Sequence, residues 1–164
     1  MTIRHCKIIL VAVVALLFGM IALNNIFNYA VNFAFVAHVL SMDTLPTNVN
    51  LPLAAFHRAV HSPTVHHIVY NLIIAAETSI ATLCFIGAIQ LFRKRHTDEF
   101  QNAKRWAIAG LTFGFSFLVT SFITTGGEWF YLWLAPEPWS GALNAATRLV
   151  LIDSVALVFL VLPE

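Results

Sequence analysis

Charged residues are scarce in this chain of 164 residues. They make up 10% of it against 59% hydrophobic residues, and the mean hydropathy is +0.80. Soluble domains carry about a quarter charged residues, so an ordinary soluble domain is excluded. A disordered chain is excluded too, because the sequence holds 14 Phe and 4 Trp. A net charge of +1 offers no cationic surface for a phosphate backbone, so we expect no nucleic-acid partner.

Cysteine is nearly absent as well. The sequence has only Cys6 and Cys84, without a CxxC pair. We therefore expect neither a disulfide framework nor thiol exchange. The sequence also lacks a nucleophile motif, a phosphate-binding loop, an internal repeat and a low-complexity tract. These absences leave no complete catalytic constellation.

Four long apolar segments dominate what is present. A hydrocarbon core of about 30 Å needs about 20 apolar residues in a helix. The pattern predicts an all-α fold, a four-transmembrane-helix bundle in a single domain over 1–164, with spans at about 8–27, 65–92, 106–125 and 144–162. We expect Ser62 and Pro63 to open the second span and Thr97 to cap the third. The pair Gly126 and Gly127 is expected to end the third span.

Basic residues lie mostly on one side of these spans. Seven of the nine Lys and Arg precede the first span or join the second to the third, namely Arg4, Lys7, Arg93, Lys94, Arg95, Lys104 and Arg105. Because cytoplasmic loops carry the excess of Lys and Arg, we expect both termini in the cytoplasm. A basic start also suits a signal peptide, but the apolar run is long for one, and we expect a span.

The segment 28–62 is too long for a structureless connector and predicts an outer cap. Apolar residues at helical spacing predict a helix over 29–41, lying in the outer interface. After a break at Asp43 and 46–52, we expect another short amphipathic turn over 53–61. Short amphipathic helices would thus cap the outer face. The later outer turn carries a predicted interfacial aromatic belt of Trp129, Tyr131, Trp133 and Trp139.

Histidines concentrate in this cap. Five of the seven lie there or at the start of the second span: His38, His57, His61, His66 and His67. His57 and His61 would share one helix face, a spacing that suits two ligands of one metal, but a closed site needs about four. Haem would need an unusual axial pair, His38 with His66 or His67. We favour interfacial histidines bonded to backbone or water and expect no cofactor, while His38, Asp43, His66, His67 and Glu128 form a candidate outer-face polar cluster.

Three ionisable residues fall inside predicted spans, where a charge costs about 2.5–3.5 kcal/mol. Glu77 lies near the middle of the second span, and Asp153 lies at a similar depth in the fourth. Arg148 lies nearer the outer surface, within reach of Glu77, Asp43 or Glu128. In a functional interpretation, these groups relay protons or bind a cation or a quinone head. In a structural interpretation, they lock the helices in register or dock a partner helix. We favour the structural alternatives.

Three segments together resemble a known family. They are the outer run from Asn32 to Asp43, the entry His66 and His67 leading through Tyr70 to Glu77, and the run 126–130. They resemble the bacterial family of predicted small integral membrane proteins, number two-one-six-five among the domains of unknown function. The resemblance covers essentially the whole chain and implies four spans in the bacterial inner membrane. It implies no activity.

The same resemblance ranks the candidate residues. His38, Asp43, Glu77, Glu128 and Arg148 match the pattern of the family. Asp153 does not, so Glu77 with Arg148 is the better intramembrane pair.

Three functional hypotheses follow. The leading one is a non-catalytic accessory or assembly subunit of a membrane complex, in contact with lipid and with a membrane-protein partner or a second copy. The second is a redox protein that binds haem, a metal or a quinone through the outer histidines. The third is a small proton-coupled carrier that uses Glu77 and Asp153.

Overall fold

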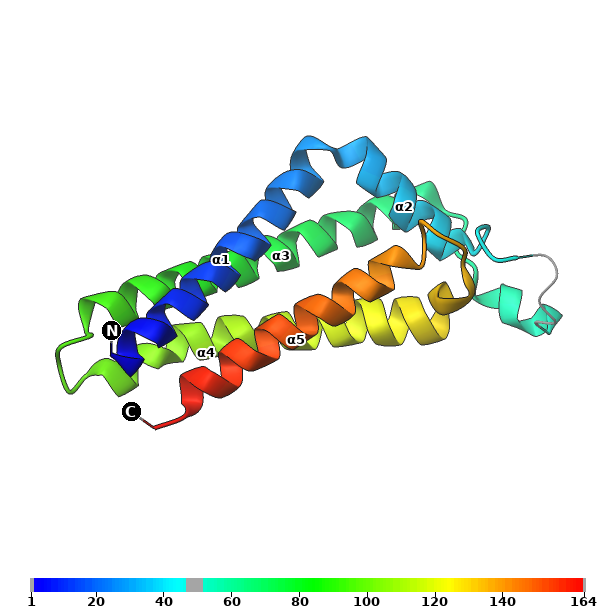
Figure 1. Ribbon diagram of the computed structural model, residues 1–164. Coiled ribbons are helices and arrows are strands. Elements are labelled where there is room, and N and C mark those ends of the chain that lie inside the picture. Colours follow the sequence, from blue (N-terminus) through cyan, green and yellow to red (C-terminus); the bar gives the residue numbers. More distant parts are fainter. Residues whose placement is uncertain (1, 47–51, 164) are drawn as a thin grey trace.

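The computed structural model describes residues 2–46 and 52–163, and all regular structure in them is helical (Figure 1). This confirms the predicted all-α class. The α-helices are α1 (Ile3–Phe27), α2 (Tyr29–Ser41), α3 (Pro63–Arg93), α4 (Phe100–Phe117) and α5 (Gly141–Val161). A π-helix, η2 (Leu118–Trp129), continues α4, and two short 3-10 helices are η1 (Leu53–Arg58) and η3 (Leu132–Leu134). Part of the predicted break at 46–52 lies outside the described residues.

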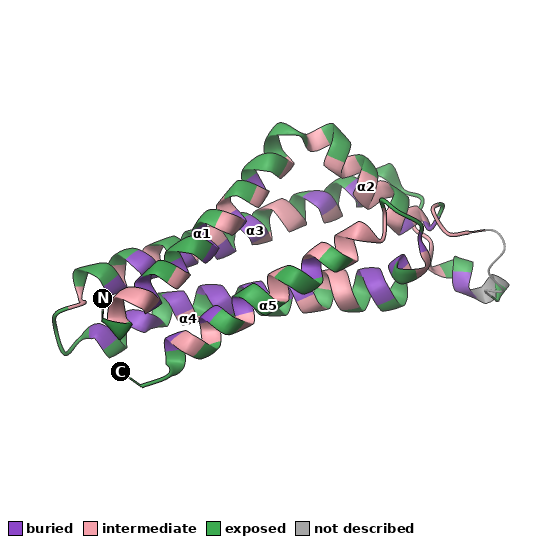
Figure 2. Cartoon of the chain, viewed as in Figure 1, coloured by how far each residue is buried: buried purple, intermediate pink, exposed green. Residues whose placement is uncertain are grey.

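Four helices are long and apolar enough to cross a membrane: α1, α3, α4 joined to η2 (Phe100–Trp129), and α5. Many residues on their outer surfaces are exposed, as Figure 2 shows, and these include many large apolar side chains. Leu16 of α1 is 66% exposed and Val155 of α5 is 63% exposed. Helices that are apolar on every face suit lipid rather than water, which agrees with the predicted bundle.

The ends of the third span differ from the prediction. The helix α4 begins at Phe100, and the Thr97 hydroxyl instead donates to the Lys94 carbonyl at 3.1 Å, so Thr97 is not its cap. The glycines Gly126 and Gly127 do not end the span, because no glycine in the described residues has the positive φ of a terminating glycine. The span continues through η2, and Tyr131, with a φ of 54°, follows soon after its end.

Close packing of small residues holds α3 against α4. A methyl group placed on Gly87 would lie 2.5 Å from the Ala107 backbone nitrogen, and one on Gly110 would lie 2.6 Å from the Cys84 sulfur. Such contacts are possible only because the two backbones approach closely at glycine, as is usual between helices in lipid. Since α3 also packs along α1, it forms the centre of the bundle.

The first two helices form one bent unit. Figure 1 shows α1 leaning away from the other spans toward its C-terminal end and α2 turning back toward the bundle. The bend lies at Asn28, whose φ of −106° and ψ of 37° interrupt the helix. The helix α2 begins and ends as predicted, and it contacts α3. This bend separates α1 from α5 on the side where the candidate site lies.

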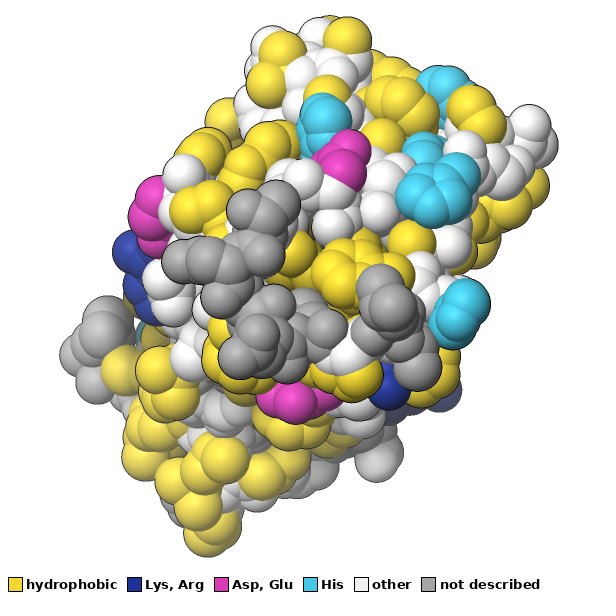
Figure 3. Space-filling model, turned by 90° about the vertical axis from the view of Figure 1, so that its right-hand side faces the viewer, with side chains coloured by type: hydrophobic (Ala, Val, Ile, Leu, Met, Phe, Trp, Pro, Cys, Tyr) yellow, Lys and Arg dark blue, Asp and Glu magenta, His cyan; other side chains and the backbone are white. Residues whose placement is uncertain are grey.

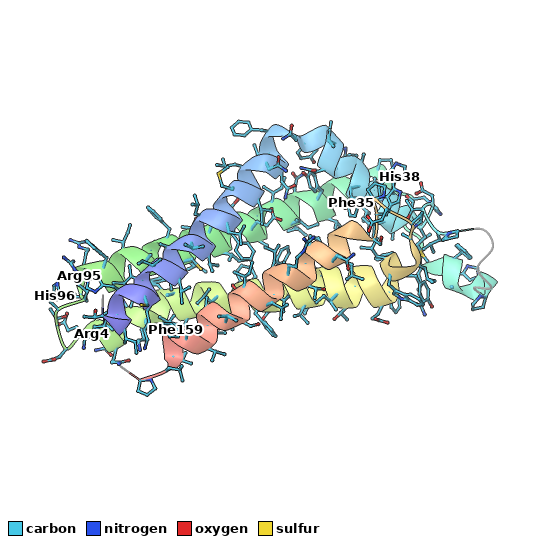
Figure 4. The ribbon with its side chains drawn as sticks, viewed as in Figure 1. Arg4, Phe35, His38, Arg95, His96 and Phe159 are labelled. Atoms are coloured by element: carbon cyan, nitrogen blue, oxygen red, sulfur yellow. The ribbon has the colours of Figure 1, made fainter. Side chains whose placement is uncertain are left out.

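Both described chain ends lie at one end of the bundle, which we call the basic end, and η1 and η3 lie at the other, the cap end (Figure 1). Arg4 Nη1 donates to the Arg95 carbonyl at 3.1 Å and to the Thr97 carbonyl at 3.0 Å, and Figure 4 shows Arg4 beside Arg95. Lys94 pairs with Glu99 and holds the pKa of that carboxyl below its ordinary value. Arg4 therefore ties α1 to the turn between α3 and α4.

Replacing Arg4 with glutamine is expected to speed tryptic cleavage at Arg93 and Arg95 about fivefold in the detergent-purified protein. The substitution removes two hydrogen bonds to the turn, and a loss of about 1 kcal/mol raises the opened population by that factor. Arg105→Gln is the control, because Arg105 is exposed and its guanidinium only faces the Trp106 ring at 5.7 Å. Equal cleavage rates in the two variants would contradict the role of Arg4.

Candidate functional site

A cavity of about 570 Å³ lies between the bent α1–α2 unit, α3 and α5. Its walls are mostly apolar and come from Phe18 and Ile21 of α1, Val31, Phe35 and Val36 of α2, Ile73 of α3, Leu118 and Phe122 of η2, and Ala142, Ala145, Ala146 and Leu149 of α5. The lining also includes a few polar side chains and residues of the turn before α5. A concave apolar site with a few convergent polar groups is the usual form of a small-molecule site.

Polar side chains form the floor of this cavity. Glu77 is 4% exposed, and its Oε2 accepts a hydrogen bond of 2.7 Å from the Asn25 amide. The buried Tyr70 hydroxyl donates to the Asn25 backbone carbonyl at 2.9 Å. That carbonyl belongs to the last turn of α1, where a helix leaves its carbonyl groups unpaired. Tyr70 and Glu77 of α3 thus hold the end of α1, and Glu77 lines the cavity at this floor.

Asn32 of α2 completes the polar floor. It lines the cavity and donates to the Asn24 backbone carbonyl at 3.5 Å. Neither Glu77 Oε1 nor Asn32 Oδ1 has a hydrogen-bond donor among the described residues. Two acceptor oxygens therefore remain open at the floor.

Aromatic and titratable side chains surround the cap end of the cavity. The Trp139 ring stacks on Phe35 with centroids 5.4 Å apart and meets the His38 ring edge-on at 5.0 Å. His38 Nδ1 lies 2.9 Å from the Asp43 carboxyl, and both residues are exposed. Figure 4 shows Phe35 and His38 near the cap end of α2. Of these residues, Phe35, His38 and Trp139 line the cavity, and we call this part its mouth.

The structure joins only two members of the predicted outer-face polar cluster, His38 and Asp43. His66 is buried, with its Nε2 2.7 Å from the Val60 carbonyl oxygen. His67 stacks on Phe33 with centroids 4.0 Å apart. Glu128 is exposed on η2 and does not line the cavity. Figure 3 shows histidines spread over the cap end rather than gathered at one point.

The predicted metal candidates His57 and His61 do not share a helix face. The expected helical turn over 53–61 forms only over Leu53–Arg58, as η1, so His61 lies beyond it. Pro63 opens α3 two residues later, which leaves no room to extend η1. Within the described ranges, no group of three or more His, Cys, Asp or Glu side chains is placed to hold a metal ion.

The three intramembrane candidates occupy separate places. Glu77 bonds to Asn25 rather than to Arg148. Arg148 is exposed on α5, and its Nε donates to the Asn144 carbonyl of the same helix at 3.3 Å. Asp153 is 1% exposed and faces Gly114, where a methyl group would lie 3.0 Å from its Oδ1. The structure therefore brings none of the three together by a hydrogen bond or ion pair among the described residues.

Replacing Asp153 with alanine is expected to raise the free energy of unfolding by about 1–2 kcal/mol. Neither Asp153 oxygen has a well-formed hydrogen bond among the described residues, although the Phe115 backbone faces them. An unsatisfied buried polar group costs about 1–3 kcal/mol, and the small cavity left by alanine offsets part of the gain. Denaturation of the purified protein measures the change. A destabilised variant would show that the carboxyl is bonded in the native protein.

The sequence patterns did not predict that Asn25, Tyr70 and Asn32 belong to the candidate site. A polar pair, Asn24 and Asn25, at the end of a wholly apolar run was the available signal. Trp139 was assigned to the interfacial belt, and only the folded turn before α5 places it against α2. The site depends on contacts between residues 52 positions apart, such as Asn25 and Glu77.

Comparison with known proteins gives one family. No curated protein and no solved structure matches the chain. The family model described as "Predicted small integral membrane protein (DUF2165)" matches residues 3–163. This match agrees with the four candidate spans and with the resemblance found in the sequence. The chain therefore belongs to this family and is a small multi-pass integral membrane protein.

Proposed function

We propose that this protein is a non-catalytic accessory or assembly subunit of a membrane complex and that it docks its partner through the exposed face of α5. Asn144, Thr147 and Arg148 form a polar patch on that face, within a helix apolar enough to span a membrane. Leu151 and Val155 continue the same face toward the basic end and are 62% and 63% exposed. The polar patch beside this apolar surface carries the proposal.

An exposed cation within a membrane span raises the free energy of the protein. Ionisable residues in spans normally face the bundle interior or a cavity, where they find partners. Arg148 faces outward, and among the described residues its one hydrogen bond goes to its own helix. A partner helix with a carboxylate at this depth would supply the missing opposite charge, and the Asn144 and Thr147 side chains would add hydrogen bonds between helices. The partner is therefore a transmembrane helix with an acidic side chain.

Site-specific photo-crosslinking in cells tests this proposal. A photoreactive phenylalanine analogue at Leu151 or Val155 is expected to give one discrete adduct that Arg148→Gln weakens at least tenfold. The same analogue at Leu16 or Met20, on the exposed face of α1, is the control and is expected to give none. Equal adducts from both faces, or none from α5, would contradict the proposal. An adduct of twice the chain mass would show that the partner is a second copy of this chain rather than a different protein.

We further place the protein in the bacterial inner membrane with both termini in the cytoplasm. Four basic residues lie at the start of α1 or in and soon after the turn between α3 and α4, at the basic end: Arg4, Lys94, Arg95 and Arg105. Cytoplasmic loops carry the excess of Lys and Arg. In a variant without native cysteines, a cysteine at Glu137 should react with an impermeant maleimide in spheroplasts. A cysteine at Thr97 should react only after the membrane is opened. The reverse pattern would overturn the orientation.

A second candidate, a cofactor-binding or carrier protein, is favoured by the cavity beside Glu77. Its volume lies in the range of small-molecule sites. An absorption spectrum and a metal analysis of the detergent-purified protein test for haem, quinone or metal. Flux of candidate solutes into proteoliposomes along a pH gradient tests for a carrier. If none of these measurements detects a cofactor or a flux, the second candidate is excluded and the accessory role is the one that stands.

A further inference from the structure

We infer that the cavity beside Glu77 binds an amphiphilic amine, a molecule with an apolar body and a primary ammonium group. This inference does not depend on the docking role of α5, because the cavity lies on the inner side of that helix. It names the chemical class of the ligand that the cavity would bind. Four observations carry it: the walls, the open acceptors of the floor, the charge balance and the mouth.

The walls select an apolar body. The cavity has a volume of about 570 Å³, and aromatic and aliphatic side chains such as Phe18, Phe122 and Leu149 cover most of it. Sites of roughly 300–1,000 Å³ with such walls enclose molecules of drug size. Burial of an apolar body against these side chains supplies most of the affinity, at about 25 cal/mol per Å² of apolar surface.

The floor selects a hydrogen-bond donor. Each donor group there already serves an acceptor of the protein: Asn25 bonds to Glu77, Tyr70 bonds to the Asn25 carbonyl, and Asn32 bonds to the Asn24 carbonyl. The floor also holds two acceptor oxygens with no donor among the described residues, Glu77 Oε1 and Asn32 Oδ1. An ammonium group has three N–H donors to offer these two oxygens.

The charge balance selects a cation. Glu77 is buried within a membrane span, and no Lys or Arg lines the cavity in the part of the chain that the structure describes. Among the described residues, the Asn25 amide is the one hydrogen-bond partner of the carboxyl. Buried carboxylates normally have a paired opposite charge. An ammonium group at Glu77 Oε1 would provide that charge and would form a charge-assisted hydrogen bond.

The mouth suits the passage of such a ligand. Phe35 and Trp139 present stacked rings at the cap end, and ring faces attract ammonium groups. Asn32 and His38 lie six residues apart on α2, so the cavity follows that helix over about 9 Å. The ammonium group would lie at the floor and the apolar body would extend toward the rings.

Fluorescence titration with dansylcadaverine tests this inference, because this probe joins an apolar fluorophore to a primary amine. The full chain in lipid nanodiscs is expected to raise the dansyl emission in a saturable manner above the signal of empty nanodiscs. Glu77→Gln should weaken binding at least tenfold, since the amide loses the charge but still accepts the bond from Asn25. Glu128→Gln, the same change at an exposed glutamate outside the cavity, should bind as the wild type does.

Two further measurements distinguish binding in the cavity from partitioning of the probe into lipid and from a loss of folding. N-acetylated dansylcadaverine, which lacks the ammonium group, should bind at least tenfold more weakly than the free amine. Ala145→Phe, which fills the cavity from α5 and leaves Glu77 intact, should also abolish saturable binding. Equal binding of the acetylated probe, or unchanged binding by Glu77→Gln and Ala145→Phe, would overturn the inference. No saturable binding to the wild type would overturn it too.

Discussion

Replacing Gly87 with alanine is expected to lower the free energy of unfolding by about 3 kcal/mol, because a methyl group there would make the shortest contact of those added at any glycine. The added methyl would lie 2.5 Å from the backbone nitrogen and 2.7 Å from the Cα of Ala107. A backbone cannot rotate away as a side chain can, so α3 and α4 must separate. Overpacking of this kind costs about 1–3 kcal/mol, and a clash with backbone lies at the upper end.

Gly110→Ala should act in the same direction, because its methyl would lie 2.6 Å from the Cys84 sulfur and 2.9 Å from the Cys84 nitrogen. Gly19→Ala in α1 is the matched control. The nearest atom to its methyl is Ala81 Cβ at 3.9 Å, which is ordinary contact, and alanine is the better helix former. Unfolding by denaturant in mixed micelles measures all three. Equal stability of the Gly87→Ala and Gly19→Ala variants would contradict the close packing of α3 against α4.

Replacing Asn25 with alanine is expected to lower the free energy of unfolding by about 2–3 kcal/mol. The Asn25 amide donates a hydrogen bond of 2.7 Å to the buried Glu77 carboxyl. Without it, Glu77 remains in the membrane interior with no partner among the described residues. Removal of one partner exposes the full desolvation cost of the other, and this cost is larger for an ionisable group.

Asn24→Ala is the control at the neighbouring position. Its side chain is exposed and bonds to Asn28 at 2.8 Å, so we expect a loss within about 0.5 kcal/mol. In the double variant Asn25→Ala with Glu77→Leu, most of the lost stability should return, because the unpaired carboxyl is gone. Additive losses in the double variant would show that Asn25 and Glu77 do not depend on each other.

The bond between Asn25 and Glu77 also connects the fold to the candidate site. Asn25 lies three residues before the bend at Asn28, and Tyr70 bonds to its backbone carbonyl. The end of α1 is therefore held to α3 by the same side chains that form the floor of the cavity. A change that frees this end of α1 should also move Glu77, so stability and ligand binding are expected to change together in Asn25→Ala.

Local patterns in the sequence predicted most helix positions correctly. The bounds of α2 at Tyr29–Ser41 and the start of α3 at Pro63 follow from apolar spacing and from proline at the first helical position. The predicted end of the third span at Gly126 and Gly127 was wrong, because neither glycine takes the positive φ of a terminating glycine. Here Gly126 and Gly127 lie buried inside η2. Buried glycine can serve packing as well as termination, and the residue type alone does not distinguish the two.

The composition and the four apolar segments by themselves determined that this protein is a helical membrane protein, since burial of apolar surface in lipid depends on the number and spacing of side chains and not on their neighbours. Only the tertiary structure decided which polar groups meet. Glu77 was predicted to pair with Arg148, yet it bonds to Asn25, and Arg148 faces outward. Hydrogen bonds need atoms within about 3 Å. Such distances depend on the bend at Asn28 and on the packing of α1 along α3, which no local pattern encodes.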